Sequence, residues 1–185
     1  MTLRIATLSD ADAIADLVRL AFGAQSRPTN PPSGALKETA ETIREHLVHG
    51  GGAISESDGA LIGVVLWEDD DGALYLSRLA VHPAHRRRGI ARALISEAEH
   101  EARRRGLPRM TLGVRLVLED NRRLFASCGF TETTLHRHEG FSEPTWVAME
   151  RRLGESPRGG IDGGGGEDHD ADDSAADDGE AGTRG

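Results

Sequence analysis

A short basic turn carries the residues of this 185-residue chain that are best suited to chemistry. It reads Arg86-Arg-Arg-Gly89, and an amphipathic stretch follows it. The first N–H groups of a helix have no partner inside the helix, and the helix dipole leaves partial positive charge there. A glycine lets a ligand approach the backbone, and arginines add charged donors. The turn therefore predicts a site for a phosphate-bearing ligand, although it matches neither the Walker A loop nor the glycine-rich dinucleotide loop.

The elements on either side must position this turn. Residues 74–81 are rich in apolar and β-favouring side chains, which predicts a buried strand. Pro83 ends the strand because proline cannot donate to a ladder. After the turn the apolar spacing becomes that of a helix. The predicted buried stripe consists of Ile90, Ala91, Leu94, Ile95, Ala98 and Ala102. Gly106 and Pro108 stop this helix.

The turn and its surroundings resemble a known family. Arg86-x-x-Gly89-x-Ala91, preceded by Leu79-Ala-Val-His-Pro83 and followed by Cys-Gly-Phe130, resembles the acetyl-CoA signature R/Q-x-x-G-x-G/A of the GCN5-related N-acetyltransferases, the GNAT family. The resemblance covers roughly residues 1–153 and is sharpest from 74 to 130. It implies acetyl-CoA as co-substrate and an amine as acetyl acceptor.

The resemblance also implies which residues hold acetyl-CoA. Backbone groups of Leu79, Ala80 and Val81 would pair with the pantetheine arm. A bulge near Leu79 would free a backbone N–H for the oxyanion. The pyrophosphate would lie on the backbone N–H groups of the turn and helix start, namely Arg86, Arg87, Arg88, Gly89, Ile90 and Ala91. The alternative interpretation of the three arginines is an exposed basic turn or a nucleic-acid patch, which usually spreads over a face together with aromatic residues.

Around residue 125 the chain departs from the family pattern. Many relatives carry a tyrosine placed to protonate the leaving thiolate, and alignment on Gly129-Phe130 places Phe125 there, which has no proton to give. The family's asparagine lies about three residues before Asn121. We keep Asn121 and Phe125 as cofactor-binding candidates, with a helix-start role and core packing as their alternatives. A free thiol has a pKa of about 8.5, so the loss of this acid need not abolish activity.

The candidates for proton transfer are Glu68, Tyr75 and His138. Glu68 ends the strand beside the central one and is the first choice for the base, although a solvent-facing carboxylate is an equal alternative. Tyr75 alternates onto one face of the central strand and could meet the acceptor. His138 lies on the last hairpin, which borders the acceptor in relatives. We expect direct attack by the amine, because no residue pairs Cys128 with a base, and we expect no metal.

The remaining pattern predicts an α/β fold with the element order βααβββαβαββ, a mixed, mostly antiparallel sheet that is split near its centre, and helices on both faces. A first strand is expected over 3–7 and helices over 11–22 and 35–48, with Leu36 facing inward. The loop 23–34 between them is a candidate specificity element by resemblance. A hairpin over 53–68 contains Gly63, which indicates a bulge or a close backbone approach.

Composition sets the domain limits. Residues 154–185 hold ten acidic residues against two arginines, so almost all of the net charge of −9 lies there. We expect 1–153 to form the acetyltransferase domain and 154–185 to be a disordered acidic tail. The single cysteine excludes an internal disulfide. No signal-peptide core or membrane-spanning run is present in the sequence, which predicts a cytoplasmic protein.

The family resemblance and the composition together indicate which partners this chain binds. We expect acetyl-CoA and an amine-bearing acceptor, most readily a small molecule, with no membrane partner, and a monomer or homodimer. The sequence leaves the acceptor open among antibiotic, polyamine, amino-acid and protein amines. Two other functions stay open: a CoA-binding module without transferase activity, which the missing tyrosine keeps in consideration, and a nucleic-acid binder that uses the arginine turn.

Overall fold

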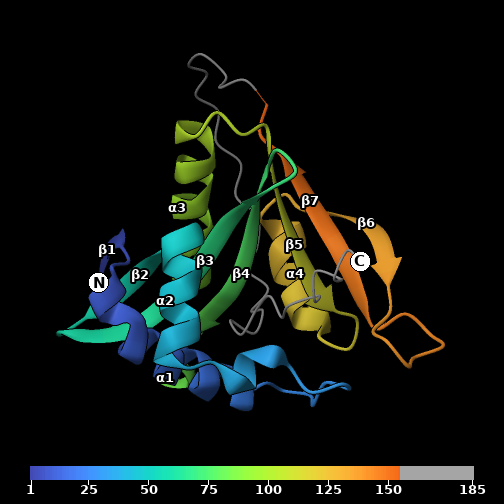
Figure 1. The fold of residues 1–185 in the computed structure, drawn as a ribbon, viewed down its shortest axis with the longest axis horizontal. Coiled ribbons are helices and arrows are strands. Elements are labelled where there is room, and N and C mark those ends of the chain that lie inside the picture. Colours follow the sequence, from blue (N-terminus) through green and yellow to red (C-terminus); the bar gives the residue numbers. More distant parts are fainter. Residues whose placement is uncertain (155–185) are drawn as a thin grey trace.

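A computed structural model describes residues 1–154 as one sheet flanked by helices (Figure 1). The strands are β1 (Thr2–Ile5), β2 (Gly51–Ser57), β3 (Ala60–Asp70), β4 (Ala73–Val81), β5 (Arg109–Arg115), β6 (Thr131–His136) and β7 (Trp146–Arg152). The α-helices are α1 (Ala11–Gly23), α2 (Ala40–His49), α3 (Ile90–Arg104) and α4 (Glu119–Ser127), and short 3₁₀ turns span Leu8–Asp10, Gly34–Lys37 and Pro83–His85. The predicted acidic tail lies outside the described residues, apart from Gly154.

The seven strands form one mixed sheet in the order β1-β2-β3-β4-β5-β7-β6. Every neighbouring pair is antiparallel except β4 and β5, which the α3 crossover joins in parallel. The predicted fold class and element order are therefore confirmed. None of the helices within residues 1–154 has the length and apolarity needed to cross a bilayer.

The sheet opens at its centre. β4 and β5 pair over only three positions, which join Leu74 to Met110, Tyr75 to Thr111 and Leu76 to Leu112. Both strands continue beyond these pairs and diverge toward their carboxyl ends (Figure 1). The predicted split is thus present, and it leaves the carboxyl-terminal part of β4 without a strand partner on its β5 side.

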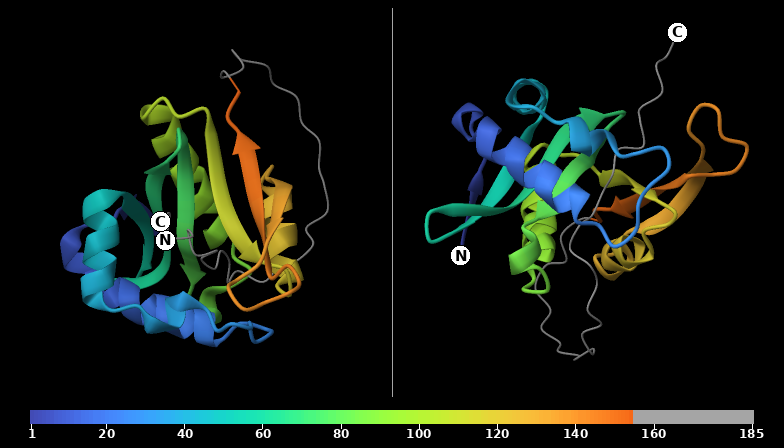
Figure 2. Two further views of the ribbon diagram at one scale, coloured as in Figure 1. Left: turned by 45° about the vertical axis from the view of Figure 1, so that its right-hand side comes forward. Right: turned by 90° about the horizontal axis from the view of Figure 1, so that it is seen from below.

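The helices cover the two faces of the sheet separately (Figure 2). On one face, α1 and the buried Ile43 of α2 form a core with Ile54, Val64 and Leu66. On the other face, the apolar stripe of α3 and the inner side of α4 pack on alternate residues of the central strands. Side-chain alternation along a strand produces these two cores, because successive residues point to opposite faces. Hence each central strand presents residues to both layers.

Gly63 permits the close approach of α3. A Cβ built at Gly63 would lie 2.7 Å from the Ile90 Cγ2 atom and 3.0 Å from the Leu94 Cδ1 atom. Those are the first two large apolar residues of α3, so the absent side chain lets the start of this helix pack against β3. The predicted close backbone approach is confirmed.

The second helix begins later than the sequence pattern suggested. The predicted helix over 35–48 is wrong in its first turn, because a 3₁₀ turn ends at Lys37 and α2 starts at Ala40. Thr39 adopts extended backbone dihedrals and its side chain accepts from the Thr42 N–H, a capping box that fixes the new start. Leu36, predicted to face inward, is exposed.

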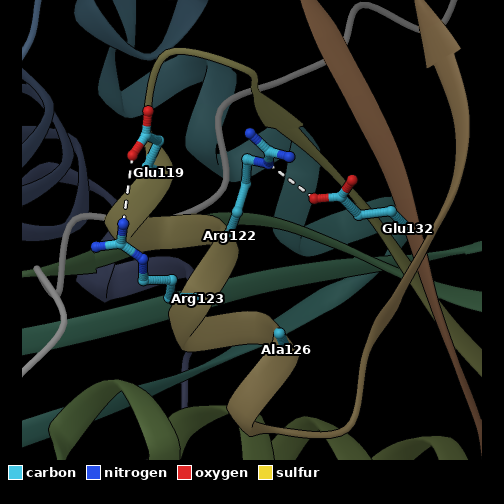
Figure 3. Close-up of a pocket in the computed structure, with 5 residues that line it drawn as sticks. All are labelled: Glu119, Arg122, Arg123, Ala126 and Glu132. Carbon is cyan, nitrogen blue, oxygen red and sulfur yellow. Dashed lines mark hydrogen bonds and ion pairs between the residues drawn. The ribbon is translucent and has the colours of Figure 1, made fainter. Parts of the chain in front are cut away.

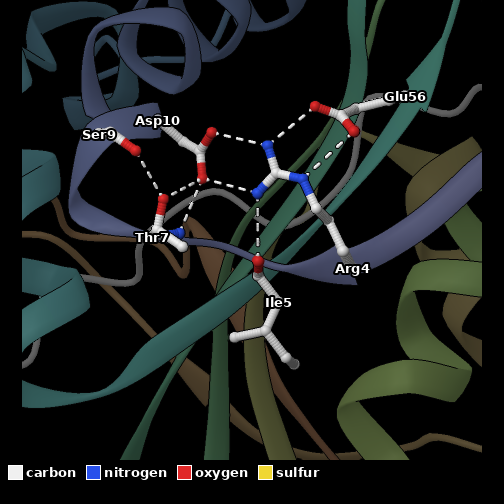
Figure 4. A network of polar contacts seen from close by, with 6 residues as sticks. All are labelled: Arg4, Ile5, Thr7, Ser9, Asp10 and Glu56. Carbon is white, nitrogen blue, oxygen red and sulfur yellow. Dashed lines mark hydrogen bonds and ion pairs between the residues drawn. The ribbon is translucent and has the colours of Figure 1, made fainter. Parts of the chain in front are cut away.

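An ion-pair network fastens the first strand to the rest of the sheet (Figure 4). The Arg4 guanidinium donates to both Asp10 carboxylate oxygens at 2.8 and 2.9 Å and to both Glu56 oxygens at 2.8 and 3.2 Å. Asp10 also accepts from the Thr7 N–H at 2.7 Å. These donors, Arg4 above all, hold the pKa of Asp10 well below its usual range.

Replacing Asp10 with asparagine is expected to lower the free energy of unfolding by about 1–2 kcal/mol at pH 7, since two charged hydrogen bonds are lost and Arg4 is partly exposed. A lowered carboxyl pKa gives stability that is complete above the unfolded pKa of about 3.9 and is lost as the pH falls further. The difference in the free energy of unfolding between the parent and the variant should therefore become smaller between pH 4 and pH 2. Urea unfolding at several pH values measures this difference. A difference that stays constant over this range would contradict the assignment.

Candidate functional site

A β-bulge interrupts the central strand. In the β3–β4 ladder, Val64 pairs with Ala80 and Leu66 pairs with Ser77, so two residues of β4 oppose one of β3. Arg78 takes up the extra length with a positive φ of 51°. A bulge releases one backbone position from the ladder. The structure thus has a bulge beside Leu79, where the sequence resemblance had implied one.

The open edge of β4 follows directly after this bulge. Ala80 and Val81 pair with β3 on one side, while the last β5 pairing is at Leu76. Unpaired strand edges bind extended chains that carry amide groups. The split therefore offers a docking line for such a chain, which begins at the bulge and ends at the basic turn.

The basic turn has the backbone shape of an anion cradle. Gly89 is the N-cap of α3 with φ 76°, and Arg87 also has a positive φ of 59°. A Cβ added at Gly89 would find no heavy atom within 4 Å, so the space in front of the helix start is open. Arg87 and Arg88 are exposed beside it. Backbone N–H groups in such a turn, at the positive end of a helix dipole, form an anion-binding concavity.

Arg86 uses its side chain differently from its two neighbours. Its guanidinium donates to the carbonyl oxygens of Ala21 and Ala24, each at 3.0 Å. Those carbonyls are at the carboxyl end of α1, where a cation also suits the helix dipole. The Arg86 side chain therefore ties the turn to α1, and any contact of this residue with a bound anion is left to its backbone.

The two α4 candidates have different surroundings. Asn121 is only 2% exposed, and its amide nitrogen has no hydrogen-bond partner among residues 1–154. Phe125 is fully buried and meets Phe130 edge to face, with ring centroids 5.7 Å apart. Phe125 thus fits its alternative interpretation as a core residue, whereas the buried amide of Asn121 keeps an unpaired donor.

A pocket of about 370 Å³ opens on the α2 face of the sheet, directly over the bulge. It is lined by Glu38, Thr42, Glu45, His46, His49, Glu68 and Arg78. The α2 members recur every three or four residues, so they share one side of the helix. Glu68 and Arg78 come from β3 and β4 below. The pocket and the open edge of β4 therefore meet at the bulge.

A buried ion pair forms the part of the pocket next to the bulge. Arg78 Nη2 lies 2.5 Å from Glu38 Oε1, and Arg78 Nε donates to the same oxygen at 2.6 Å. Both side chains are less than 10% exposed. The Thr42 hydroxyl donates to the other Glu38 oxygen. The pair is therefore held rigidly, and it links the bulge of β4 to the start of α2.

His46 lies beside this pair. Its Nε2 atom is 3.8 Å from Glu38 Oε1. Burial lowers the pKa of His46, and the charge of Arg78 lowers it further, against the opposing effect of Glu38, Glu68 and Glu45. The sequence pattern alone does not single out His46. The helix start at Thr39 decides which side of α2 carries His46. The Thr39 capping box is therefore the sequence signal that could have shown which α2 residues face the pocket.

The predicted catalytic residues are only partly brought together. Glu68 and Tyr75 are paired across the β3–β4 ladder on the α2 face, and Glu68 lines the pocket. His138 does not line it. It contacts Thr145 and lies 3.4 Å from Arg115 on the far side of the split. Buried Arg115 also donates to the carbonyl oxygen of Pro31 at 3.0 Å, so it joins the 24–33 loop to the last hairpin.

A second pocket, of about 310 Å³, lies between α4 and β6 (Figure 3). Its charges are matched within the pocket: Arg122 bonds to Glu132 at 2.7 Å, and Arg123 contacts Glu119 at 3.3 Å. The lining residues include neither the bulge nor the basic turn. We therefore assign the candidate site to the split and to the α2 pocket.

Comparison with known proteins points to one family. The model of the acetyltransferase (GNAT) family matches residues 14–130. An L-methionine sulfoximine/L-methionine sulfone acetyltransferase of Salmonella typhimurium is 33% identical over 101 residues, which are 52% of this chain and 59% of that protein. The chain spans between 46% and 59% of the length of the curated relatives that it matches first.

Solved structures have the same fold. The yncA structure from Salmonella typhimurium, which contains its cofactor acetyl-CoA, has a TM-score of 0.64 at 26% identity, over 86% of this chain and 98% of that one. The ribosomal-protein-alanine N-acetyltransferase of Brucella melitensis has a TM-score of 0.65 at 20% identity, over 83% of this chain and all of that one. At 20% identity, the second comparison shows only that the fold is shared.

Proposed function

The chain belongs to the GNAT family of acetyltransferases, and from this premise we propose that it transfers the acetyl group of acetyl-CoA to an amine. The observation that carries the proposal is the meeting of three features at one point: the split in the sheet, the bulge at Arg78, and the α2 pocket. A thioester at the bulge would lie between the cofactor arm along the open edge of β4 and an acceptor in the α2 pocket. The solved relative that contains acetyl-CoA supports this choice of donor.

The residues present fit acetyl-CoA. The open edge of β4 along Leu79, Ala80 and Val81 suits the amide groups of pantetheine. The α3 cradle, with Arg87 and Arg88 beside it and Gly89 at its centre, suits a pyrophosphate. The buried Asn121 amide adds a donor on α4. When bound, acetyl-CoA supplies an activated acetyl group, and the protein supplies its alignment with the amine.

The α2 pocket is the proposed acceptor side. Arg78 neutralises Glu38, and the carboxylates of Glu45 and Glu68 remain to attract an ammonium group. A pocket of this size takes a small molecule. One curated relative is named for acetylating methionine derivatives, which supports amino acids and related small amines as the first acceptors to test.

The proposed reaction is direct. The neutral amine attacks the thioester carbonyl carbon, the backbone N–H freed at the bulge stabilises the oxyanion, and CoA departs as a thiolate. Phe125 offers the thiolate no proton, but a thiol of ordinary acidity is an adequate leaving group. Cys128 suits no covalent step, because burial raises the pKa of its thiol.

Calorimetric titration of the full chain tests this function. Acetyl-CoA is expected to bind with a dissociation constant in the micromolar range. Pantetheine, which lacks the phosphates, should bind at least about tenfold more weakly because the α3 cradle stays empty. Release of CoA with a panel of amino acids, polyamines and aminoglycosides then identifies the acceptor.

Three results would contradict the proposal in different ways. A folded chain that binds no acetyl-CoA would exclude the whole assignment. Tight binding without CoA release by any amine would favour a CoA-binding module, the function that the absent tyrosine at position 125 keeps open. Binding of nucleic acid that weakens steeply with salt would instead favour the arginine-turn alternative.

A further inference from the structure

We propose that His46, rather than Glu68, is the base that takes the proton from the acceptor ammonium in the α2 pocket. The inference rests on the proposed acetyl transfer and assigns the proton-transfer step within it. It starts from the position of His46, which lines the pocket together with the bulge residue Arg78. The reacting carbon of a thioester at the bulge would therefore lie next to Arg78, at the edge of the pocket that His46 lines.

The buried Glu38–Arg78 pair fixes His46 relative to the bulge. Glu38 Oε1 is 2.5 Å from Arg78 Nη2 and 3.8 Å from His46 Nε2. One carboxylate oxygen thus stands between the bulge residue and the imidazole. Because Thr42 also holds Glu38, the carboxylate cannot move toward the imidazole without losing a hydrogen bond. An amine entering the pocket would meet a base that is held on a helix and not on a loop.

The charges around His46 suit a base that is neutral before the reaction. From β4, the Arg78 cation opposes protonation, as does burial. From α2, the segment before it and β3, the carboxylates of Glu45, Glu38 and Glu68 face the imidazole and stabilise it once it is protonated. Imidazole is the side chain whose basicity best matches neutral pH. Glu68 then acts as a charge that attracts the ammonium group.

His46 takes one proton from R-NH3⁺, and the resulting R-NH2 forms the new C–N bond to the acetyl carbon as the C–S bond breaks. The second proton of the nitrogen passes to the CoA thiolate, which gives CoA-SH and the acetamide. The imidazolium then releases its proton to solvent. The net products are the acetylated amine, CoA-SH and one proton.

The kinetic test uses the most active amine from the panel together with its β-fluorinated analogue, whose ammonium is far more acidic. His46→Gln should lower kcat/KM for the basic amine about 100-fold near neutral pH and shift the acidic limb of the pH profile up to the pKa of the amine itself. The loss should be much smaller for the fluorinated amine, which needs no base. Glu68→Gln should raise KM and keep the acidic limb. The exposed His100 on α3 provides the matched control, and His100→Gln should behave like the parent.

Two further readouts separate a base from a structural residue. His46→Ala leaves a cavity, and imidazole added to the buffer should restore turnover in that variant only. Equal losses for both amines, or no rescue of a folded variant, would overturn the inference while leaving the proposed function intact. NMR titration of labelled histidines in the full chain needs no acceptor at all. A His46 imidazole that stays protonated above pH 7 would also overturn it, whereas failure to bind acetyl-CoA would reject the proposed function itself.

Discussion

Acetyl-CoA binding is expected to weaken on the order of a thousandfold when Gly89 is replaced by glutamate. Gly89 has φ 76° at the N-cap of α3, and the space in front of it is open. A side chain there would point a carboxylate into the anion cradle, and like charges brought together cost several kcal/mol. About 4 kcal/mol corresponds to this thousandfold change. Calorimetric titration of parent and variant measures it.

Gly59 supplies the matched control. It has φ 78°, also has no heavy atom within 4 Å of a built Cβ, and lies in the β2–β3 turn away from the split. Gly59→Glu carries the same backbone strain, about 1–2 kcal/mol, and the same added charge. It should bind acetyl-CoA like the parent. If both variants bound equally, the phosphates would have to lie elsewhere than at the start of α3.

The largest loss of stability is expected from Gly50→Ala. A Cβ at Gly50 would lie 1.9 Å from the carbonyl oxygen of Trp67 and 2.9 Å from its carbonyl carbon. Both atoms belong to the backbone of β3, so no rotamer change can relieve the contact. We expect the free energy of unfolding to fall by about 3 kcal/mol or more, as measured by urea denaturation.

Gly23→Ala is the control for this prediction. Gly23 ends α1, and a Cβ there would make only an ordinary contact, 4.0 Å from Leu36. Its replacement should be neutral or slightly stabilising, because alanine favours helix. If Gly50→Ala proved equally mild, the connection between α2 and β2 would have to be more adaptable than the structure indicates. A shift of α2 would also displace His46, so acetyl transfer should suffer together with stability.

The fold could be predicted where its signals are local. The strand, basic turn and helix around Gly89 are contiguous, and each has its own period or breaker, so their order followed from the sequence. The bulge near Leu79 needed the family resemblance, because the residue that adopts it, Arg78, resembles any strand residue in the sequence. The start of α2 was misplaced because helix-favouring residues from Ala35 onward concealed the Thr39 cap.

The candidate site was predicted less completely, because it depends on contacts between distant residues. Glu38 and Arg78 are 40 positions apart, and neither shows in the sequence that it will be buried with the other. His46 is predicted to face the same pocket only when α2 is given its correct start. Likewise, nothing local in the arginine run indicated that the Arg86 guanidinium would bind α1 carbonyls while Arg87 and Arg88 remain exposed.

The short β4–β5 ladder has a consequence for amide hydrogen exchange. Central strands usually exchange most slowly, because both of their edges are paired. Here β4 pairs with β5 only as far as Leu76, so the amides of Leu79–Val81 that point toward β5 lie outside that ladder. The middle of the sheet should therefore contain fast-exchanging amides between slower flanks. A ligand that docks along β4 should slow these amides selectively, so their exchange rates would report occupancy of the split residue by residue.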